Sequence, residues 1–237
     1  MVRRVAERIR RIEWQAVERE LEEVGCARLP RLLPAGACRE LIRLWERRDG
    51  FRSSVEMAAH GFGEGSYRYF AEPLPKVVAL LRRRLYPPLA RIARVWAGRL
   101  GSDAAYPPGH AAYRRLCRAA GQTRPTPLLL RYAAGGYNCL HQDRYGPMVF
   151  PLQVAVLLSA PGRDFEGGEL VLVENRPRMQ SRALALSVGR GDAVVFPSAE
   201  RPVAGARGFY RASVRHGVSR LTAGERYALG VIFHDAQ

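Results

Sequence analysis

His141, Asp143 and His216 combine two imidazoles and one carboxylate, a donor set that binds Fe(II) and leaves three coordination positions open. His141 and Asp143 are two residues apart, so on a strand their side chains point to the same face. The third ligand, His216, can come from a distant strand once the sheet closes. Because three positions stay open, this pattern predicts an oxidation that uses O2 rather than a hydrolysis.

Arg226 follows His216 by ten residues and opens an expected C-terminal strand. Alternation along that strand sends Arg226, Ala228 and Gly230 to one face, where the two small residues leave room for a ligand. A buried guanidinium needs a partner, and a carboxylate binds it in a bidentate manner. We therefore predict that Arg226 binds the far carboxylate of 2-oxoglutarate, which fills two of the open metal positions. Arg220 is the alternative cation.

The other three histidines are expected to lie outside this site. His60 and His110 belong to the part of the chain that reads as loop and helix, where we expect surface or capping positions. His234, followed by Asp235, comes directly after the last expected strand. We expect this pair to form a solvated chain end.

Length and composition predict a folded protein without a membrane span. The chain has 237 residues with 47% hydrophobic content, enough for one large domain or two small ones. No apolar run reaches the ~20 residues of a transmembrane helix. The basic N-terminus has no apolar segment of a signal peptide, and the four cysteines have no zinc-type spacing, so we expect a cytoplasmic protein with reduced thiols.

The chain carries a formal net charge of +16, and all but one of its 38 Lys and Arg residues are arginine. The codon usage of a GC-rich genome explains the preference for arginine over lysine. It does not explain 38 basic residues against 22 acidic ones. The excess therefore favours a polyanionic partner such as nucleic acid.

Helices are expected before residue 120 and strands after it. Apolar spacing predicts helices over 6–24, 36–48, 75–100 (broken at Pro87-Pro88) and 109–120. Short Val-, Leu- and Phe-rich runs between glycine turns predict strands over 128–132, 150–158, 169–173, 182–187, 193–196 and 227–233. This order predicts an α+β chain with a mainly β core, a sandwich or barrel at 121–237. The helical region 1–120 should cover one sheet, so that both parts form one structural unit.

These residues resemble the 2-oxoglutarate/Fe(II) dioxygenase superfamily, whose fold is a double-stranded β-helix, or jelly roll. The pattern is of the prolyl-4-hydroxylase type: Tyr132 stands nine residues before His141, and the segments 165–170 and 191–196 also match. Segments 137–146 (Tyr-Asn-x-Leu-His-Gln-Asp-x-Tyr-Gly) and 215–219 resemble, more closely, a bacterial family predicted to demethylate damaged nucleic-acid bases oxidatively. The alkylated-base demethylases carry a second arginine six residues after the first, where this chain has Ile232.

The resemblance implies Fe(II), 2-oxoglutarate and O2 as cofactors, with ascorbate as a further one. Arg226 and Tyr132 would bind the 5-carboxylate of 2-oxoglutarate. The substrate would be hydroxylated with release of succinate and CO2. An N-methyl base treated in this way gives an unstable hemiaminal that loses formaldehyde. Asn138, Gln142 and Gln153 are candidate polar neighbours that orient the imidazoles.

Three hypotheses for the function of the chain remain open. For nucleic acid, segment 67–70 (Tyr-Arg-Tyr-Phe) on an expected loop supplies aromatic rings, Arg144-Tyr145 lies at the mouth, and 82–84 (Arg-Arg-Arg) supplies charge or a solvated helix face. The alternative is a prolyl-type protein hydroxylase that acts on a peptide or a ribosome-associated protein. A jelly-roll binding module without activity is disfavoured, because every ligand position is filled.

Overall fold

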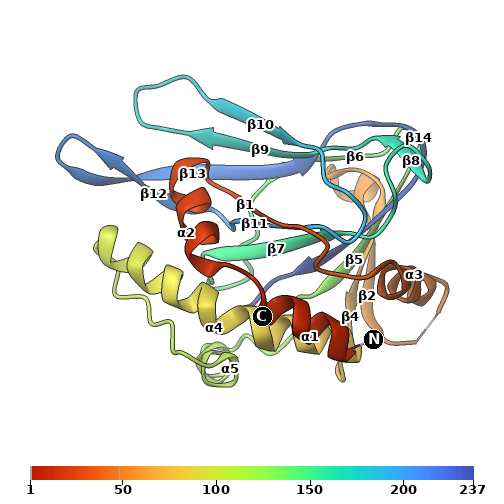
Figure 1. The fold of residues 1–237 in the computed structure, drawn as a ribbon, viewed down its shortest axis with the longest axis horizontal. Coiled ribbons are helices and arrows are strands. Elements are labelled where there is room, and N and C mark those ends of the chain that lie inside the picture. The colour runs from red at the N-terminus through yellow and green to blue at the C-terminus, as the bar shows by residue number, and fades with distance from the viewer. Residues whose placement is uncertain (1, 48) are drawn as a thin grey trace.

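The computed structural model describes residues 2–47 and 49–237, and its centre is a pair of facing antiparallel sheets (Figure 1). The larger sheet has eight strands in the order β1-β11-β7-β14-β5-β4-β2, with β8 paired to β14. The bounds of its strands are β1 Ala27–Leu29, β2 Phe51–Glu56, β4 Ser66–Phe70, β5 Leu128–Ala133, β7 Leu152–Leu157, β8 Phe165–Gly167, β11 Ala193–Pro197 and β14 Leu221–Val231.

The smaller sheet has six strands in the order β10-β9-β13-β6-β3, with β12 paired to β13. The bounds of its strands are β3 Gly63–Glu64, β6 Tyr137–His141, β9 Leu170–Asn175, β10 Arg182–Leu186, β12 Glu200–Gly205 and β13 Gly208–Val218. The six predicted strands correspond to β5, β7, β9, β10, β11 and β14, and the two facing sheets confirm the predicted jelly roll.

Helices cover the outer face of the larger sheet, as predicted, whereas the smaller sheet has none over its outer face in Figure 1. Their bounds are α1 Val2–Arg10, α2 Trp14–Glu23, α3 Ala35–Arg43, α4 Lys76–Arg99 and α5 His110–Ala119, with 3-10 turns at Leu44–Glu46 and Met57–His60. The apolar side chains of α4 share one core with those of β7 and β14. Within residues 2–47 and 49–237, no helix is both long and apolar enough to cross a membrane.

The first half of the chain contributes strands as well as helices, which corrects the expectation of a mostly helical region. β2 and β4 extend the larger sheet beside β5. The segment 67–70 therefore lies on a strand and not on a loop. Side chains along this strand alternate between two faces, as strand geometry requires. Tyr67 and Tyr69 face the space between the sheets, whereas Phe70 joins the core under the helices.

Three helix predictions were wrong in detail. The expected helix 6–24 is two helices, α1 and α2, and the expected helix 36–48 ends as α3 at Arg43, with Arg48 outside the described residues. Pro87 and Pro88 do not break α4. Proline removes the hydrogen bond to the carbonyl four residues earlier, here at Arg83 and Arg84. Both arginines are exposed, so water can bind those carbonyls and the helix continues.

The chain end is buried, which corrects the expectation of a solvated His234-Asp235 pair. Both side chains are 0% exposed. Arg82, expected on a solvated helix face, is buried as well and donates to Asp235 Oδ1 at 2.6 Å. Arg114 donates to the other oxygen of this carboxylate at 3.0 Å. The last residues are therefore fixed to α4 and α5 by a buried ion cluster, which the sequence order alone does not indicate.

We expect Asp235→Ala to lower the free energy of unfolding by about 3–5 kcal/mol, because it leaves the Arg82 guanidinium buried without its carboxylate. Chemical denaturation measures the change. Glu72→Ala is the matched control, since it removes the exposed partner of Arg114 and should cost no more than about 1 kcal/mol. Equal effects of the two substitutions would contradict a structural role for the buried pair.

His110 is also buried, and the prediction of a surface or capping position was wrong. Its Nε2 donates to the carbonyl of Phe233 at 2.9 Å, and its ring lies 5.1 Å from that of Tyr86. His60, by contrast, is exposed as expected. Burial lowers the pKa of His110 to about 3 and the pKa of His234 to about 4. Both rings are therefore neutral in the folded protein at pH 7.

These two histidines make stability depend on pH. Between pH 6.5 and about 4 the unfolded chain binds protons that the folded chain does not, so the free energy of unfolding falls as the pH is lowered. Each histidine contributes up to about 1.4 kcal/mol per pH unit in this window. Denaturation of His110→Gln at several pH values checks this, because the amide can keep the bond to Phe233 without titrating. A slope equal to that of the unchanged protein would contradict the assignment.

Candidate active site

Neighbouring strands bring His141, Asp143 and His216 together. His141 ends β6 and pairs directly with His216 on β13, and their ring centroids are 4.2 Å apart. Asp143 follows in the next turn, with Oδ2 3.2 Å from His216 Nε2 and Oδ1 3.7 Å from His141 Nε2. One ligand atom from each residue lies within 4.8 Å of the others. The two nitrogens and the carboxylate can therefore hold one metal ion.

The surroundings of His141 leave its Nε2 free to bind a metal. Its Nδ1 lies 2.8 Å from the carbonyl oxygen of Cys139. A carbonyl only accepts, so Nδ1 carries the proton and Nε2 has the lone pair. Burial and the adjacent His216 lower the pKa of His141, which keeps the ring neutral. Phe196, whose ring centroid is 4.9 Å from that of His216, packs on the second imidazole.

Asp143 is held as a carboxylate. Burial alone would raise its pKa, but His216, His141 and the hydroxyl of Tyr145 together hold the pKa well below its usual range. Tyr145 donates to Asp143 Oδ1 at 2.6 Å and accepts from Tyr69 at 3.1 Å. Burial and the nearby Asp143 raise the pKa of Tyr145, so it stays a donor. This chain of hydroxyls fixes the orientation of the carboxylate.

Tyr145→Phe should weaken metal binding about 10–100-fold, because it removes the hydrogen bond that orients Asp143. Titration of the protein with Mn(II) under anaerobic conditions measures the affinity. Tyr210→Phe, a half-buried tyrosine on β13 in the hairpin with β12, is the control and should change nothing. Unchanged affinity in Tyr145→Phe would show that the metal ligands need no support from this hydroxyl.

Arg226 lies on the opposite wall of the same space. It is 5% exposed, its Nε has no hydrogen-bond partner, and none of the described residues forms an ion pair with it. Its Cζ lies 5.7 Å from the ring centroid of Tyr132, its direct neighbour on β5. The Tyr132 hydroxyl accepts from Asn138 Nδ2 at 3.2 Å, so its own proton is available for another acceptor. Arg220, the alternative cation, is exposed.

A cavity of about 410 Å³ joins these groups between the two sheets. Arg226, Ala228 and Gly230 line it together, as the alternation of the strand predicts. Tyr67 and Tyr69 from β4 form another wall. The space thus holds three side chains that can bind one metal ion, aromatic rings, and a buried cation with which none of the described residues forms an ion pair.

The three amides expected near the imidazoles have different roles. Asn138 bonds to Tyr132, and Gln142 donates to the carbonyls of Ala199 and Val214, which ties the turn after β6 to β12 and β13. Gln153 lines the cavity, and its Nε2 has no hydrogen-bond partner. Sequence reasoning did not identify Phe196, because nothing distinguishes it from other apolar strand residues.

Residues 65–236 match the model of a family described as an oxygenase catalysing oxidative methylation of damaged DNA. The chain belongs to this family. Two uncharacterized proteins, from two strains of Mycobacterium tuberculosis, are 49% identical to it over 167 residues, which cover 70% of this chain and 72% of theirs. Membership confirms the prediction of an oxidoreductase of the oxygenase class.

Solved structures share the fold. A Burkholderia pseudomallei oxidoreductase of the 2OG-Fe(II) oxygenase family has a TM-score of 0.50 at 19% identity, covering 95% of this chain and 94% of that one. A prolyl hydroxylase from Trichoplax adhaerens, solved with a peptide fragment of hypoxia inducible factor, has a TM-score of 0.57 at 14% identity, covering 99% and 94%. These likenesses show that the fold is shared with a 2OG-Fe(II) oxygenase family member and with a prolyl hydroxylase.

Proposed function

We propose that His141, Asp143 and His216 bind Fe(II), that Arg226 and Tyr132 bind the 5-carboxylate of 2-oxoglutarate, and that the enzyme demethylates alkylated bases in nucleic acid. One observation carries the cosubstrate assignment: Arg226 is buried without an acidic partner in the cavity that contains the triad. A buried, unpaired guanidinium is unfavourable unless a ligand supplies the carboxylate. Burial lowers the pKa of Arg226, which reflects the same cost.

When bound, Fe(II) and 2-oxoglutarate supply the oxidation: 2-oxoglutarate becomes succinate and CO2 with one oxygen atom of O2, and the other oxygen hydroxylates a substrate C–H bond. The protein positions these groups. Arg226 fixes the far carboxylate, Tyr132 donates a second hydrogen bond, and Tyr145 orients Asp143. The apolar walls exclude water from the reacting carbon.

Three observations support an alkylated base as the substrate. The family description concerns damaged DNA. Tyr67 and Tyr69 line the cavity, where an unstacked base can pack on aromatic rings. Arg52 lies 4.3 Å above the ring of Tyr69 and donates through Nε to the carbonyl of Pro125, and none of the described residues forms an ion pair with it, so its charge is not neutralised by an acid and can attract a phosphate. Hydroxylation of an N-methyl group gives a hemiaminal, which breaks down to the free N–H and formaldehyde. The reaction therefore removes the methyl group.

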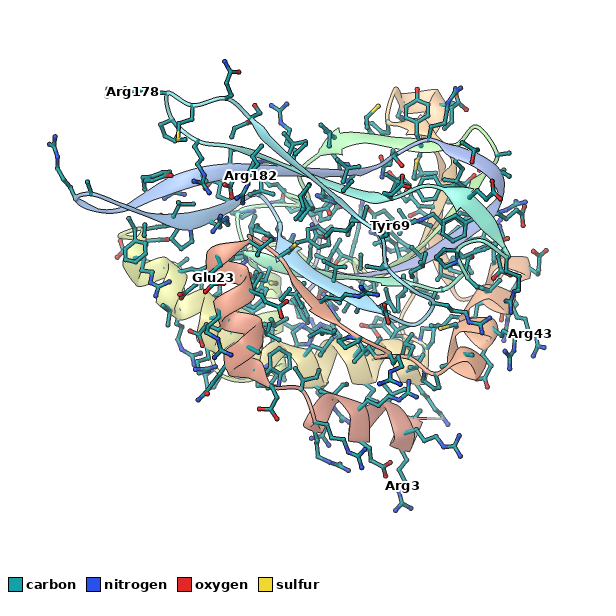
Figure 2. All side chains as sticks on the ribbon, turned by 45° about the horizontal axis from the view of Figure 1, so that its top comes forward. Arg3, Glu23, Arg43, Tyr69, Arg178 and Arg182 are labelled. Carbon is teal, nitrogen blue, oxygen red and sulfur yellow. The ribbon has the colours of Figure 1, made fainter. Side chains whose placement is uncertain are left out.

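The basic charge supports the same substrate in a general way. In Figure 2, Arg3, Arg43 and Arg178 project outward on different sides of the molecule. Such spread-out charge attracts a polyanion without selecting a sequence. A role in DNA repair and a cytoplasmic location follow from this proposal as further predictions.

Succinate formation tests the proposal. The protein is incubated with Fe(II), 2-oxoglutarate and O2, together with a methylated oligonucleotide or with candidate proline-containing peptides. We expect the methylated oligonucleotide to stimulate turnover and to release formaldehyde. Stimulation by peptide alone would favour the prolyl-type hydroxylase instead. A protein that binds neither Fe(II) nor 2-oxoglutarate would refute both.

A further inference from the structure

Gln153 is a buried amide to which the cosubstrate assignment gives no role. It lies on β7, is 4% exposed, and lines the cavity with an Nε2 that has no hydrogen-bond partner. Leaving such a donor unpaired costs about 1–3 kcal/mol. Gln142, which follows β6 of the other sheet, has acceptors for its Nε2 within the protein. The Nε2 of Gln153 is therefore free to donate a hydrogen bond to a bound ligand.

The register of the sheet separates Gln153 from Arg226. Gln153 pairs with Phe196 on β11. Its neighbour Val154 pairs with Val231 on β14, which sets Gln153 beside Ile232. Six residues separate Ile232 from Arg226, a Cα distance of about 20 Å along an extended chain. The amide thus lies at the opposite end of the cavity from the predicted cosubstrate contact.

This end of the cavity, which we call the slot, is lined mainly by apolar and aromatic side chains next to the Gln153 amide. Ala155 and Gly230 are paired across β7 and β14 and both line the cavity, and the side chain of Leu128 packs over Gly230, so the floor is apolar. Tyr69 comes from the other edge, in the same cross-strand row as Gly230 through Leu128. An apolar floor and an aromatic ring at the side provide the surfaces on which a planar group can pack next to the Gln153 amide.

We propose that Gln153 is the residue that recognises the substrate, and that it hydrogen-bonds the edge of an unstacked nucleobase held in this slot. An amide can donate to and accept from the edge of adenine or cytosine. The pyrrolidine ring of a prolyl substrate has no acceptor of its own, so it would leave Nε2 unpaired. The inference rests on the proposed function, since it names the substrate contact of the same site.

Gln153→Leu tests it, because leucine keeps most of the volume and removes both polar atoms. Gln180→Leu is the matched control: the same substitution on an exposed residue between β9 and β10. Each protein is loaded anaerobically with Mn(II) and 2-oxoglutarate. Fluorescence anisotropy then compares two single-stranded oligonucleotides, one with an N-methylated adenine and one with an abasic position in its place. The affinity for 2-oxoglutarate is measured separately.

We expect the unchanged protein and Gln180→Leu to prefer the strand with the methylated base. In Gln153→Leu this preference should fall about tenfold, the equivalent of one hydrogen bond, with unchanged affinity for 2-oxoglutarate. A preference that survives in Gln153→Leu, or that the unchanged protein lacks, would overturn the inference. So would a weakened affinity for 2-oxoglutarate, which would make Gln153 a cosubstrate contact.

The proposed function fails in a different way. If the unchanged protein prefers the methylated base and Gln153→Leu does not, the slot is supported. If the unchanged protein forms no succinate from 2-oxoglutarate with Fe(II) and O2, the proposed oxidation is refuted, whereas the contact between Gln153 and the base is still supported.

Discussion

An enzyme with His216→Ala turns over no 2-oxoglutarate above background. The substitution removes one of the three side chains that can hold the metal in the part of the chain that the structure describes. Loss of a residue that merely orients a ligand weakens metal binding about 10–100-fold, so loss of a ligand must cost more. Metal titration and succinate formation measure the two consequences independently. Asp143 would keep the imidazole of His141 as a neighbour, 3.7 Å away.

The fold should survive this change. His216 makes no side-chain hydrogen bond through Nδ1 within the described chain, and alanine fits on a strand. His60→Ala, at an exposed position outside the triad, is the control and should keep full activity. If His216→Ala remained active, the third ligand would have to be another residue, and the geometry around Asp143 would not be that of the metal centre.

Arg226→Met is expected to raise the KM for 2-oxoglutarate at least about 100-fold, because a buried charge pair of this kind contributes about 3 kcal/mol or more. The substitution should also stabilise the protein in the absence of cosubstrate. It replaces a buried guanidinium that has no ion-pair partner in the described chain with an apolar side chain of similar length. Steady-state kinetics and thermal unfolding without 2-oxoglutarate measure these two effects.

Arg220→Met is the matched control, since it removes an exposed arginine of the same segment. It should leave both the KM and the melting temperature as they are. Addition of 2-oxoglutarate should raise the melting temperature of the unchanged protein and of Arg220→Met, but not that of Arg226→Met. A KM that rises in Arg220→Met instead would move the cosubstrate contact to that residue.

The catalytic half of the fold could be predicted because its strands carry their own periodic signal. Leu170–Asn175 alternates buried and half-buried residues, and Ala193–Pro197 is buried throughout, as apolar strands between glycine turns should be. The strand β4 escaped prediction because Ser66–Phe70 is short and aromatic. Such a segment becomes a strand through its pairing with β5, a long-range contact that no local pattern records.

The chain end was mispredicted for a related reason. Because His234 and Asp235 follow the last strand, we expected them to be exposed to solvent. Instead, Arg82 and Arg114, which lie far away in sequence, pair with the Asp235 carboxylate. Burial of a charge depends on its partners, and these are brought together only when α4 and α5 pack on the sheet. The same packing buries His110 against Phe233.

The sequence by itself determined which side chains are candidates for the chemistry: His141, Asp143 and His216 carry donor atoms suited to one metal ion, and Arg226 on an alternating strand is predicted to face a carboxylate. Residue types and local spacing suffice for these inferences, because ligand chemistry and strand alternation are local properties. Only the tertiary structure decided what surrounds them. Folding brings Tyr145 onto Asp143, leaves Arg226 without an ion-pair partner among the described residues and leaves the Gln153 Nε2 unpaired in the cavity. Those properties depend on which distant strands become neighbours, so sheet packing and not sequence spacing sets them.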